Sequence, residues 1–474
     1  MQHTRRTRAR EEWRLRNHVP STDALTRTPP PAPTPSPAAP ERSASSCLPP
    51  AEPAPRRAAL VTTMRFNATS IDSFICYYLY IGFYKLYVYA DDASDPIVDA
   101  ARSYPSERVA IIVRDAKLER EWQALPSWQR LAMYVGSEVQ ARQQLNCEHC
   151  MDKCRAAKLD WLLHVDSDEL LWLPEMVAGE HATERGKRSP LQRHLELLDK
   201  RGALIFTYRN LEAVPEQLEC ADPFREIDLF KQHSSQLDPH RTAVARAMRY
   251  WTEAEGAGGE YFRFYENGKS MVRVHESMRV AASVHEWTLP SKEAVQSAGY
   301  TNNRNLHHSS YIPHQRMRID EAYGAVLLHF PVCSFSVFWN KRWAALGYAS
   351  PNHRFRGGGG GLDQRANALM LGQRRDEAEA LYRRSMMIDS ETQLKLQLDA
   401  SVCLRNTALR TVVESGRAHL LPSAARSRVA TSPFAPAAAG GAASPLPALN
   451  ADLNAELVQA TAVVTMGAND GCDW

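Results

Sequence analysis

Alternating apolar patterns in the first third of the chain constrain its fold more than any other feature. Three short runs are rich in β-branched and aromatic residues, as strands are: LVTTM at 60–64, KLYVYA at 85–90 and VAIIV at 109–113. A helical pattern over 70–81 ends at Gly82, a residue that commonly ends helices. This alternation predicts a βαβαβ unit, whose strands are parallel and whose crossovers are right-handed.

Further elements are expected along the rest of the chain. Four more segments have the pattern of strands: 203–208, 270–274, 280–284 and 325–330. Helical patterns cover 191–198 and 362–388. We therefore expect an α/β fold with a mixed, mainly parallel sheet that is flanked by helices.

An acidic interruption of an apolar run, WLLHVDSDELLWLP at 161–174, is the strongest functional signal. Residues 161–165 are apolar except for His164, as in a strand covered on both faces, and the carboxylates begin where that strand would leave the sheet. The strand period of two would point Asp166 and Asp168 the same way, toward one hard divalent cation. In open α/β sheets, ligands bind beyond these strand ends.

Other interpretations of this acidic segment are weaker. Asp and Ser are ordinary turn residues, so the pair could form a solvated turn, but the apolar residues of 170–173 place it between buried segments. An EF-hand is excluded because Leu171 stands where its glycine is needed. A phosphatase-type Asp nucleophile ranks low because the pair follows several earlier strand patterns.

Both ends of the chain differ in composition from its middle. Residues 1–57 hold arginine-rich runs and a tract of Pro, Ala and Ser, and residues 421–474 are again of low complexity, so both tails are expected to be disordered. Residues 58–350 are expected to form the main domain, and 351–420 a glycine-rich connector with a helical extension. No apolar run is long enough for a transmembrane helix, and the first residues lack the apolar centre of a secretory signal.

The cysteines include one cluster, Cys147, Cys150 and Cys154 in NCEHCMDKC. Together with His149 they could bind zinc. Their spacing of i, i+3 and i+7 also describes one buried face of a helix, and we favour the helix.

Four segments in this order resemble the glycosyltransferases of family 92 and the related family 2 type, which have a GT-A fold. They are VTTMRFNATSIDSFICYYLYIGFYKLYVYADDASD, WLLHVDSDELLWLP, KSMVRV with VHEW, and LLHFPVCSFSVFWNKR. The resemblance covers about residues 59–345. It implies a GT-A-like domain in which Asp166 and Asp168 form a DXD motif. There they would bind a Mn²⁺ or Mg²⁺ ion that holds the diphosphate of a nucleotide sugar.

The resemblance also implies a nucleotide-binding edge. This edge would be formed by residues that follow the first two strands: Arg65, Asn67, Asp92, Ser94 and Asp95. The usual Arg-Asn-Glu after the first strand is replaced here by Arg-Phe-Asn-Ala, so Arg65 and Asn67 depart from the family pattern.

Two histidines and two glutamates complete the predicted site. His285 and His329 each follow a strand-like run and could be a third metal ligand, or else hydrogen-bonded core histidines. Glu169 and Glu286 are candidates for the general base that activates an acceptor hydroxyl, only because they lie near the motifs. Basic residues beside strands could contact phosphates, although such residues are more often solvated; they are Lys269, Arg273, Lys341 and Arg342.

The sequence thus predicts a metal-dependent transferase that moves a sugar from a nucleotide sugar to the hydroxyl of a glycan or another acceptor. The alternative is a catalytically inactive binding or scaffold protein of the same fold. A nucleic-acid binder ranks last, because the basic residues of 1–10 are not matched by a basic, aromatic-rich module. By resemblance the compartment would be the secretory pathway (Golgi). No signal or membrane anchor supports this, and donor, acceptor and stereochemical outcome are not fixed.

Overall fold

The computed structural model describes most of the chain between residues 55 and 425. The described residues are 55–64, 70–173, 176, 188–200, 202–253, 260–276, 278–287, 324–340, 361–423 and 425. The predicted disorder of the two tails falls almost wholly on residues outside these ranges. Arg65, Asn67, Lys341, Arg342 and the glycines 357–360 also lie outside them.

Four parallel strands form one half of the sheet. β1 (Ala58–Met64) pairs with both β2 (Lys85–Ala90) and β4 (Trp161–His164), and β2 pairs with β3 (Val109–Val113). The helices α2 (Ile71–Ile81) and α3 (Ile97–Arg102) connect the first three strands. Gly82 ends α2 with a left-handed φ of 117°, a conformation that suits glycine. The predicted βαβαβ unit is confirmed.

The other half of the sheet is mostly antiparallel. β8 (Lys269–Arg273) runs antiparallel to β4 and to β6 (Ile205–Ala213), which pairs with β7 (Leu229–Lys231). β5 (Glu169–Trp172) pairs antiparallel with β9 (Val326–His329), which is parallel to β6. The order along the described sheet is β10-β7-β6-β8-β4-β1-β2-β3, where β10 is the strand Cys403–Arg405. The predicted α/β fold with a mixed sheet flanked by helices is confirmed.

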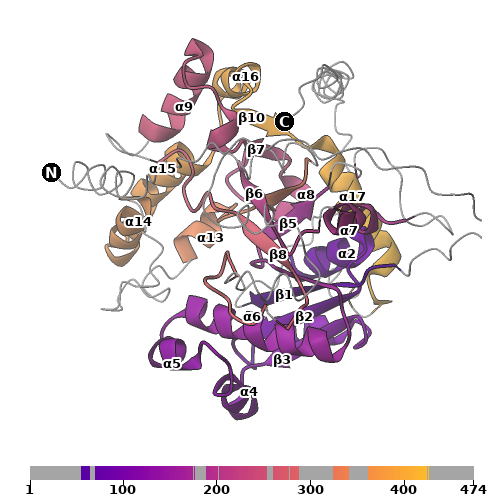
Figure 1. The fold of residues 1–474 in the computed structure, drawn as a ribbon. Helices are drawn as coiled ribbons and strands as arrows, with labels where there is room; N and C mark the ends of the chain where they lie inside the picture. The colour runs from indigo at the N-terminus through magenta and orange to yellow at the C-terminus, as the bar shows by residue number, and fades with distance from the viewer. Residues whose placement is uncertain are drawn as a thin grey trace, which may run out of the picture. The chain divides into compact units, whose positions relative to one another are not determined.

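The alternation of side chains in β1, β2 and β4 gives the sheet two apolar faces. One face packs against α2, α3, α7 (Pro190–Lys200) and α17 (Thr407–Leu420), and the other against α4 (Ala116–Trp122) and α6 (Val139–Ala156). In Figure 1, α6 lies beside β1 to β3, while α2, α7 and α17 gather together. Because both faces are covered, β1 and β4 are buried throughout and β2 is buried except at Lys85, as expected for central strands of a parallel sheet, whereas β3 is half-buried beyond Val109.

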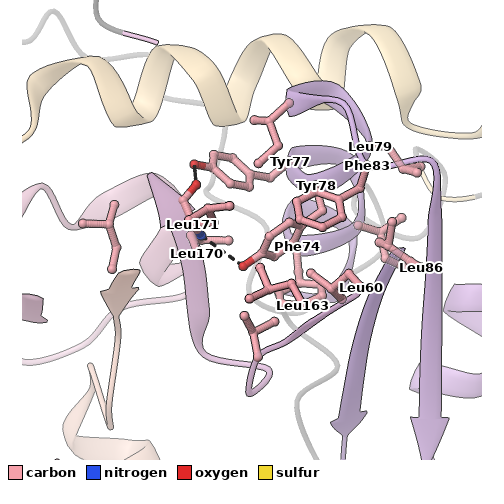
Figure 2. Close-up of a cluster of buried hydrophobic side chains, with 14 of the residues drawn as sticks. Leu60, Phe74, Tyr77, Tyr78, Leu79, Phe83, Leu86, Leu163, Leu170 and Leu171 are labelled. Carbon is pink, nitrogen blue, oxygen red and sulfur yellow. Dashed lines mark hydrogen bonds between the residues drawn. The ribbon is translucent and has the colours of Figure 1, made fainter. Parts of the chain in front are cut away.

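Two tyrosines of α2 fasten β5 to this core (Figure 2). The hydroxyl of Tyr78 donates to the carbonyl of Glu169 at 2.9 Å and accepts from the amide of Leu171 at 3.0 Å. The hydroxyl of Tyr77 donates to the carbonyl of Leu171 at 2.7 Å. Helix α2 therefore fixes the backbone of β5, the strand that begins directly after Asp168.

The C-terminal part of the described chain belongs to this domain. β10 (Cys403–Arg405) extends the sheet by pairing with β7, and α17 packs closely on α2 at Gly416. The helix expected over 362–388 is two helices, because the chain turns at Gly372 and at Gln373, whose φ is 54°. The remaining described helices are α5 (Trp128–Leu131), η1 (Ala132–Tyr134), α8 (Pro223–Glu226), η3 (Ser234–Gln236), α9 (Thr242–Glu253), α13 (Phe335–Asn340), α14 (Gly361–Leu371), α15 (Arg375–Met386) and α16 (Glu391–Asp399).

Two more sequence-based expectations are decided by the structure. The strand expected over 280–284 is wrong: this segment is an irregular loop with one bridge between Ala281 and Trp287. The helical interpretation of Cys147, Cys150 and Cys154 is confirmed, since all three lie buried on α6. Among the described residues, no helix has the length and apolar character needed to cross a membrane.

Candidate functional site

The acidic segment forms a tight turn between β4 and β5. β4 ends at His164 and β5 begins at Glu169, whose amide donates to the carbonyl of Asp166 at 3.2 Å. Asp166 and Asp168 therefore lie in a turn and not on a strand, so the strand alternation that was expected to align them does not apply. The turn does follow the carboxyl end of a parallel strand, as predicted.

Asp166 is held by two side chains. Its Oδ1 accepts from Nε2 of Gln143 on α6 at 2.5 Å, and its Oδ2 accepts from Nζ of Lys269 on β8 at 2.7 Å. Burial by itself would raise the pKa of Asp166, but the Lys269 ammonium holds that pKa well below its usual range. Asp166 is therefore a carboxylate paired with an internal cation.

Glu169, a predicted general base, lies inside the protein. Its side chain is fully buried, its Oε2 accepts from the amide of Asp166 at 2.7 Å, and its Oε1 lies 3.9 Å from Nζ of Lys269. Burial raises the pKa of Glu169 well above its ordinary value, because it outweighs the attraction of Lys269. The structure thus gives this side chain a place beneath the turn, and its catalytic role stays a prediction.

Asp168 and His329 come together from distant parts of the sequence. The antiparallel pairing of β5 and β9 places Glu169 opposite His329, and Nε2 of His329 lies 3.9 Å from Oδ2 of Asp168. The amide of Phe330 donates to the carbonyl of Asp168 at 2.8 Å, which fixes the turn against β9. The Asp168 side chain is 34% exposed, whereas that of His329 is 5% exposed. One carboxylate thus opens to solvent beside one buried imidazole.

This pair suits a divalent ion such as Mn²⁺, which accepts carboxylate and imidazole ligands and leaves further positions for phosphate oxygens and water. Asp166 is instead turned toward Lys269 and Gln143. Within the part of the chain that the structure describes, no group of three or more His, Cys, Asp or Glu side chains is arranged to hold a metal ion. Among the described residues, Asp168 and His329 are the two predicted ligands that lie side by side, and metal binding by any of Asp166, Asp168, His285 and His329 stays a prediction.

His285 contacts the same aromatic ring as His329. The ring of Tyr265 has its centroid 4.7 Å from that of His285 and 4.6 Å from that of His329. Nδ1 of His285 donates to the carbonyl of Gly268 at 2.8 Å, so the second ring nitrogen of the neutral form is an acceptor. Burial and, next, the charge of Lys269 lower the pKa of His285 to about 3, which keeps its ring neutral.

Glu286 follows His285 in the loop of residues 278–287. Its backbone carbonyl accepts from the amides of Ala282 and Ser283 at 2.9 and 3.1 Å, and the residue is half-buried. The loop is attached to the sheet just before this position, because the hydroxyl of Ser270 donates to the carbonyl of His285 at 2.9 Å.

The turn after β2 lies at the same edge of the sheet. Oδ1 of Asp92 accepts from the amide and the hydroxyl of Ser94 at 2.9 and 2.7 Å, and Oδ1 of Asp95 accepts from the amide of Ile97 at 3.0 Å. These side chains thus shape the turn and the start of α3. Their predicted contacts with a nucleotide remain predictions, as do those of Arg65 and Asn67, which lie outside the described residues.

The structure adds residues that the sequence analysis missed or misplaced. Lys269 and Arg273 were expected as phosphate contacts, but Lys269 is fully buried and Arg273 is paired with Asp199. Gln143 and Tyr265 gave no local signal. His164 did give one, as the polar residue in an apolar strand: its Nδ1 donates to the carbonyl of Val284 at 2.8 Å, and burial lowers its pKa to about 4.

Two curated proteins of Arabidopsis thaliana are similar to this chain, and both are named glycosyltransferase-like. The first is 28% identical over 225 residues, which are 45% of this chain and 45% of that protein. The second is 24% identical over 215 residues, which are 44% of this chain and 38% of that protein. The similarity thus spans less than half of each relative's length.

The other two comparisons add little. No protein-family model matches the chain. Among solved structures, the apo form of mouse xyloside xylosyltransferase 1 aligns with 57% of this chain and 77% of its own, at 14% sequence identity and a TM-score of 0.22. A likeness at that score carries no argument about the fold or the activity of this chain.

Proposed function

We propose that this chain is a metal-dependent glycosyltransferase that uses a nucleotide-sugar donor and a hydroxyl acceptor, such as that of a glycan. One observation carries the proposal. Oδ2 of Asp168 and Nε2 of His329 lie 3.9 Å apart beyond the carboxyl end of β4, where α/β sheets bind ligands. The two glycosyltransferase-like relatives support the same class of reaction.

Asp168 and His329 would hold the Mn²⁺ or Mg²⁺ ion, which supplies Lewis-acid neutralisation of the departing diphosphate when it is bound. The protein's part is to keep these side chains in place. Backbone pairing of β5 with β9 fixes the distance between them, and the ring of Tyr265 packs against the His329 imidazole. Preorganised groups of this kind lower the cost of stabilising charge during the reaction.

The test is a panel of nucleotide sugars, incubated with the purified protein in Mn²⁺ and, separately, in EDTA. Donor hydrolysis and transfer to simple sugar acceptors are both measured. Turnover of at least one donor in Mn²⁺ and its loss in EDTA are expected. Binding of a nucleotide sugar without turnover under any condition would instead support the inactive binding protein. The absence of both binding and turnover would overturn the proposal.

A further inference from the structure

Lys269 is the centre of the charged groups around the acidic turn. Its ammonium is fully buried and lies 2.7 Å from Oδ2 of Asp166 and 3.9 Å from Oε1 of Glu169. It also donates to the carbonyl of Val284 at 3.3 Å, and it lies 5.4 Å from the centroid of the Tyr265 ring. The candidate site thus contains a buried positive charge, the Lys269 ammonium, next to its acidic turn.

The two aspartates of the turn have different partners. Both oxygens of Asp166 accept hydrogen bonds, one from Gln143 and one from Lys269. The more exposed Asp168 lies instead beside His329. The carboxylate of Asp166 is thus neutralised by an internal cation, whereas that of Asp168 is placed to meet an incoming ion.

We propose that Lys269 is a positioning residue that acts as an internal counter-ion: it keeps Asp166 off the metal and weakens metal binding at Asp168 and His329. This inference rests on the proposed metal site. A metal ion bound at Asp168 and His329 is repelled by the nearby Lys269 ammonium. The ion also lacks Asp166 as a ligand, because that carboxylate is paired with Lys269. The negative charge of a bound diphosphate would offset this repulsion, so the ion is held well only together with the donor.

The experiment measures the affinity of the full chain for Mn²⁺ alone, from the electron paramagnetic resonance signal of free Mn²⁺. Lys269→Met removes the charge and keeps most of the volume. It is expected to bind Mn²⁺ about tenfold more tightly than the wild type, the order of effect for removing a like charge at close range. A purely structural role for Lys269 predicts the opposite, because a disordered site would bind the ion more weakly.

Arg273 provides a matched control. It lies at the other end of β8, opposite Trp161 at the start of β4, and its largely buried side chain pairs with Asp199. Arg273→Met breaks a largely buried ion pair on the same strand but away from the acidic turn, so it should destabilise the protein and leave the Mn²⁺ affinity unchanged. If Lys269→Met does not fold, Lys269→Gln is measured instead, because it also removes the charge but can still donate a hydrogen bond to the groups that Lys269 contacts.

The outcomes separate this inference from the proposed function. Tighter Mn²⁺ binding by the Lys269 variant supports the inference. If the wild type binds Mn²⁺ and the folded Lys269 variant binds it equally or more weakly, the inference is wrong while the metal site stands. If only the variant binds Mn²⁺ alone, the inference is supported, and Mn²⁺ binding by the wild type in the presence of a nucleoside diphosphate then decides the proposed metal dependence. If neither protein binds Mn²⁺, with or without the diphosphate, both are wrong.

Discussion

Glu169 and His329 lie opposite each other in the antiparallel ladder of β5 and β9. This register brings a histidine from the far C-terminal side of the chain to the acidic turn. The hydroxyl of Tyr78 then fixes the backbone of β5 at Glu169, and the amide of Phe330 fixes β9 at Asp168. The geometry of the candidate site is therefore set by backbone pairing, which single side-chain substitutions at its surface should leave intact.

Replacing Asp168 by Asn should abolish most activity without unfolding the protein. The side chain is 34% exposed and lies beside His329, so the change removes the proposed metal ligand and a negative charge but keeps the shape. Turnover of any donor found should fall by about a hundredfold or more, as when a main electrostatic stabiliser is lost. Asp99→Asn, at a side chain that is 87% exposed on α3, is the control. Full Mn²⁺-dependent transfer by Asp168→Asn would show that this motif is misassigned.

Asp166→Asn should behave differently, because it breaks a pair with a buried cation. The sequence suggested that the two aspartates would act alike, but Lys269 has no exposed surface and would lose its charged partner. We expect the free energy of unfolding to fall by about 2 to 4 kcal/mol. Urea denaturation of Asp166→Asn and Asp168→Asn, side by side, measures this. Equal stability of the two variants would show that Lys269 does not depend on Asp166.

The sequence predicted the local elements well, because their signals are local. The bounds of β2 and β3 agree with the expected runs, and Gly82 ends α2 as expected. β5 was not foreseen as a strand, since the apolar residues after Glu169 are also compatible with a buried loop or helix. The segment 280–284 has a strand-like composition, yet it forms a loop that side chains of β4 and β8 fasten.

The candidate site was predicted only in part, because some of its contacts join elements that are distant in the sequence. The acidic turn and His329 could be named from their neighbours along the chain. The pairing of Asp166 with Lys269 and Gln143 depends on how β8 and α6 pack beside β4, which no local pattern encodes. From the sequence alone, a lysine at the start of a strand, such as Lys269, is expected to be exposed.

Chelation should leave the folded state intact. Cys147, Cys150 and Cys154 are packed in the core on α6, and burial raises the pKa of Cys147 and Cys150, so thiolates are disfavoured there. Zinc binds the thiolate form. The midpoint of thermal unfolding should therefore be the same in EDTA as in buffer, within about 1 °C. A large drop in EDTA, restored by added zinc, would mean that these cysteines hold a structural metal.

Enlarging Gly416 should destabilise the domain, which tests whether α17 is part of the core. A Cβ at this position would lie 3.0 Å from the carbonyl oxygen of Cys76 and 3.1 Å from Cβ of Tyr80, both on α2. Gly416→Leu should cost about 3 kcal/mol by overpacking, whereas Ala418→Leu, at an exposed position of α17, should cost little. Thermal melts compare the two. Equal melting temperatures would place α17 outside the cooperative unit.

Asp222 provides a pH-dependent contribution to stability. It is buried where α2, α8 and α17 meet, and its carboxylate accepts from the hydroxyl of Ser73 and the amide of Phe224. Burial raises its pKa to about 6, although Arg417 and Arg225 lie near enough to lower it in part. The folded protein therefore binds the proton of Asp222 more tightly than the unfolded chain does.

The sign of the effect follows from this difference. An acid whose pKa is higher in the folded state stabilises the fold fully below its unfolded pKa, and this stabilisation is lost as the pH rises through about 6. Asp222→Asn keeps an acceptor for Phe224 but cannot ionise. The stability of the wild type relative to Asp222→Asn should therefore fall by up to about 3 kcal/mol between pH ~4 and pH ~7. Urea denaturation of both proteins at each pH measures the difference. A constant difference would mean that Asp222 has the same pKa in the folded and unfolded states, and that Arg417 and Arg225 cancel the effect of its burial.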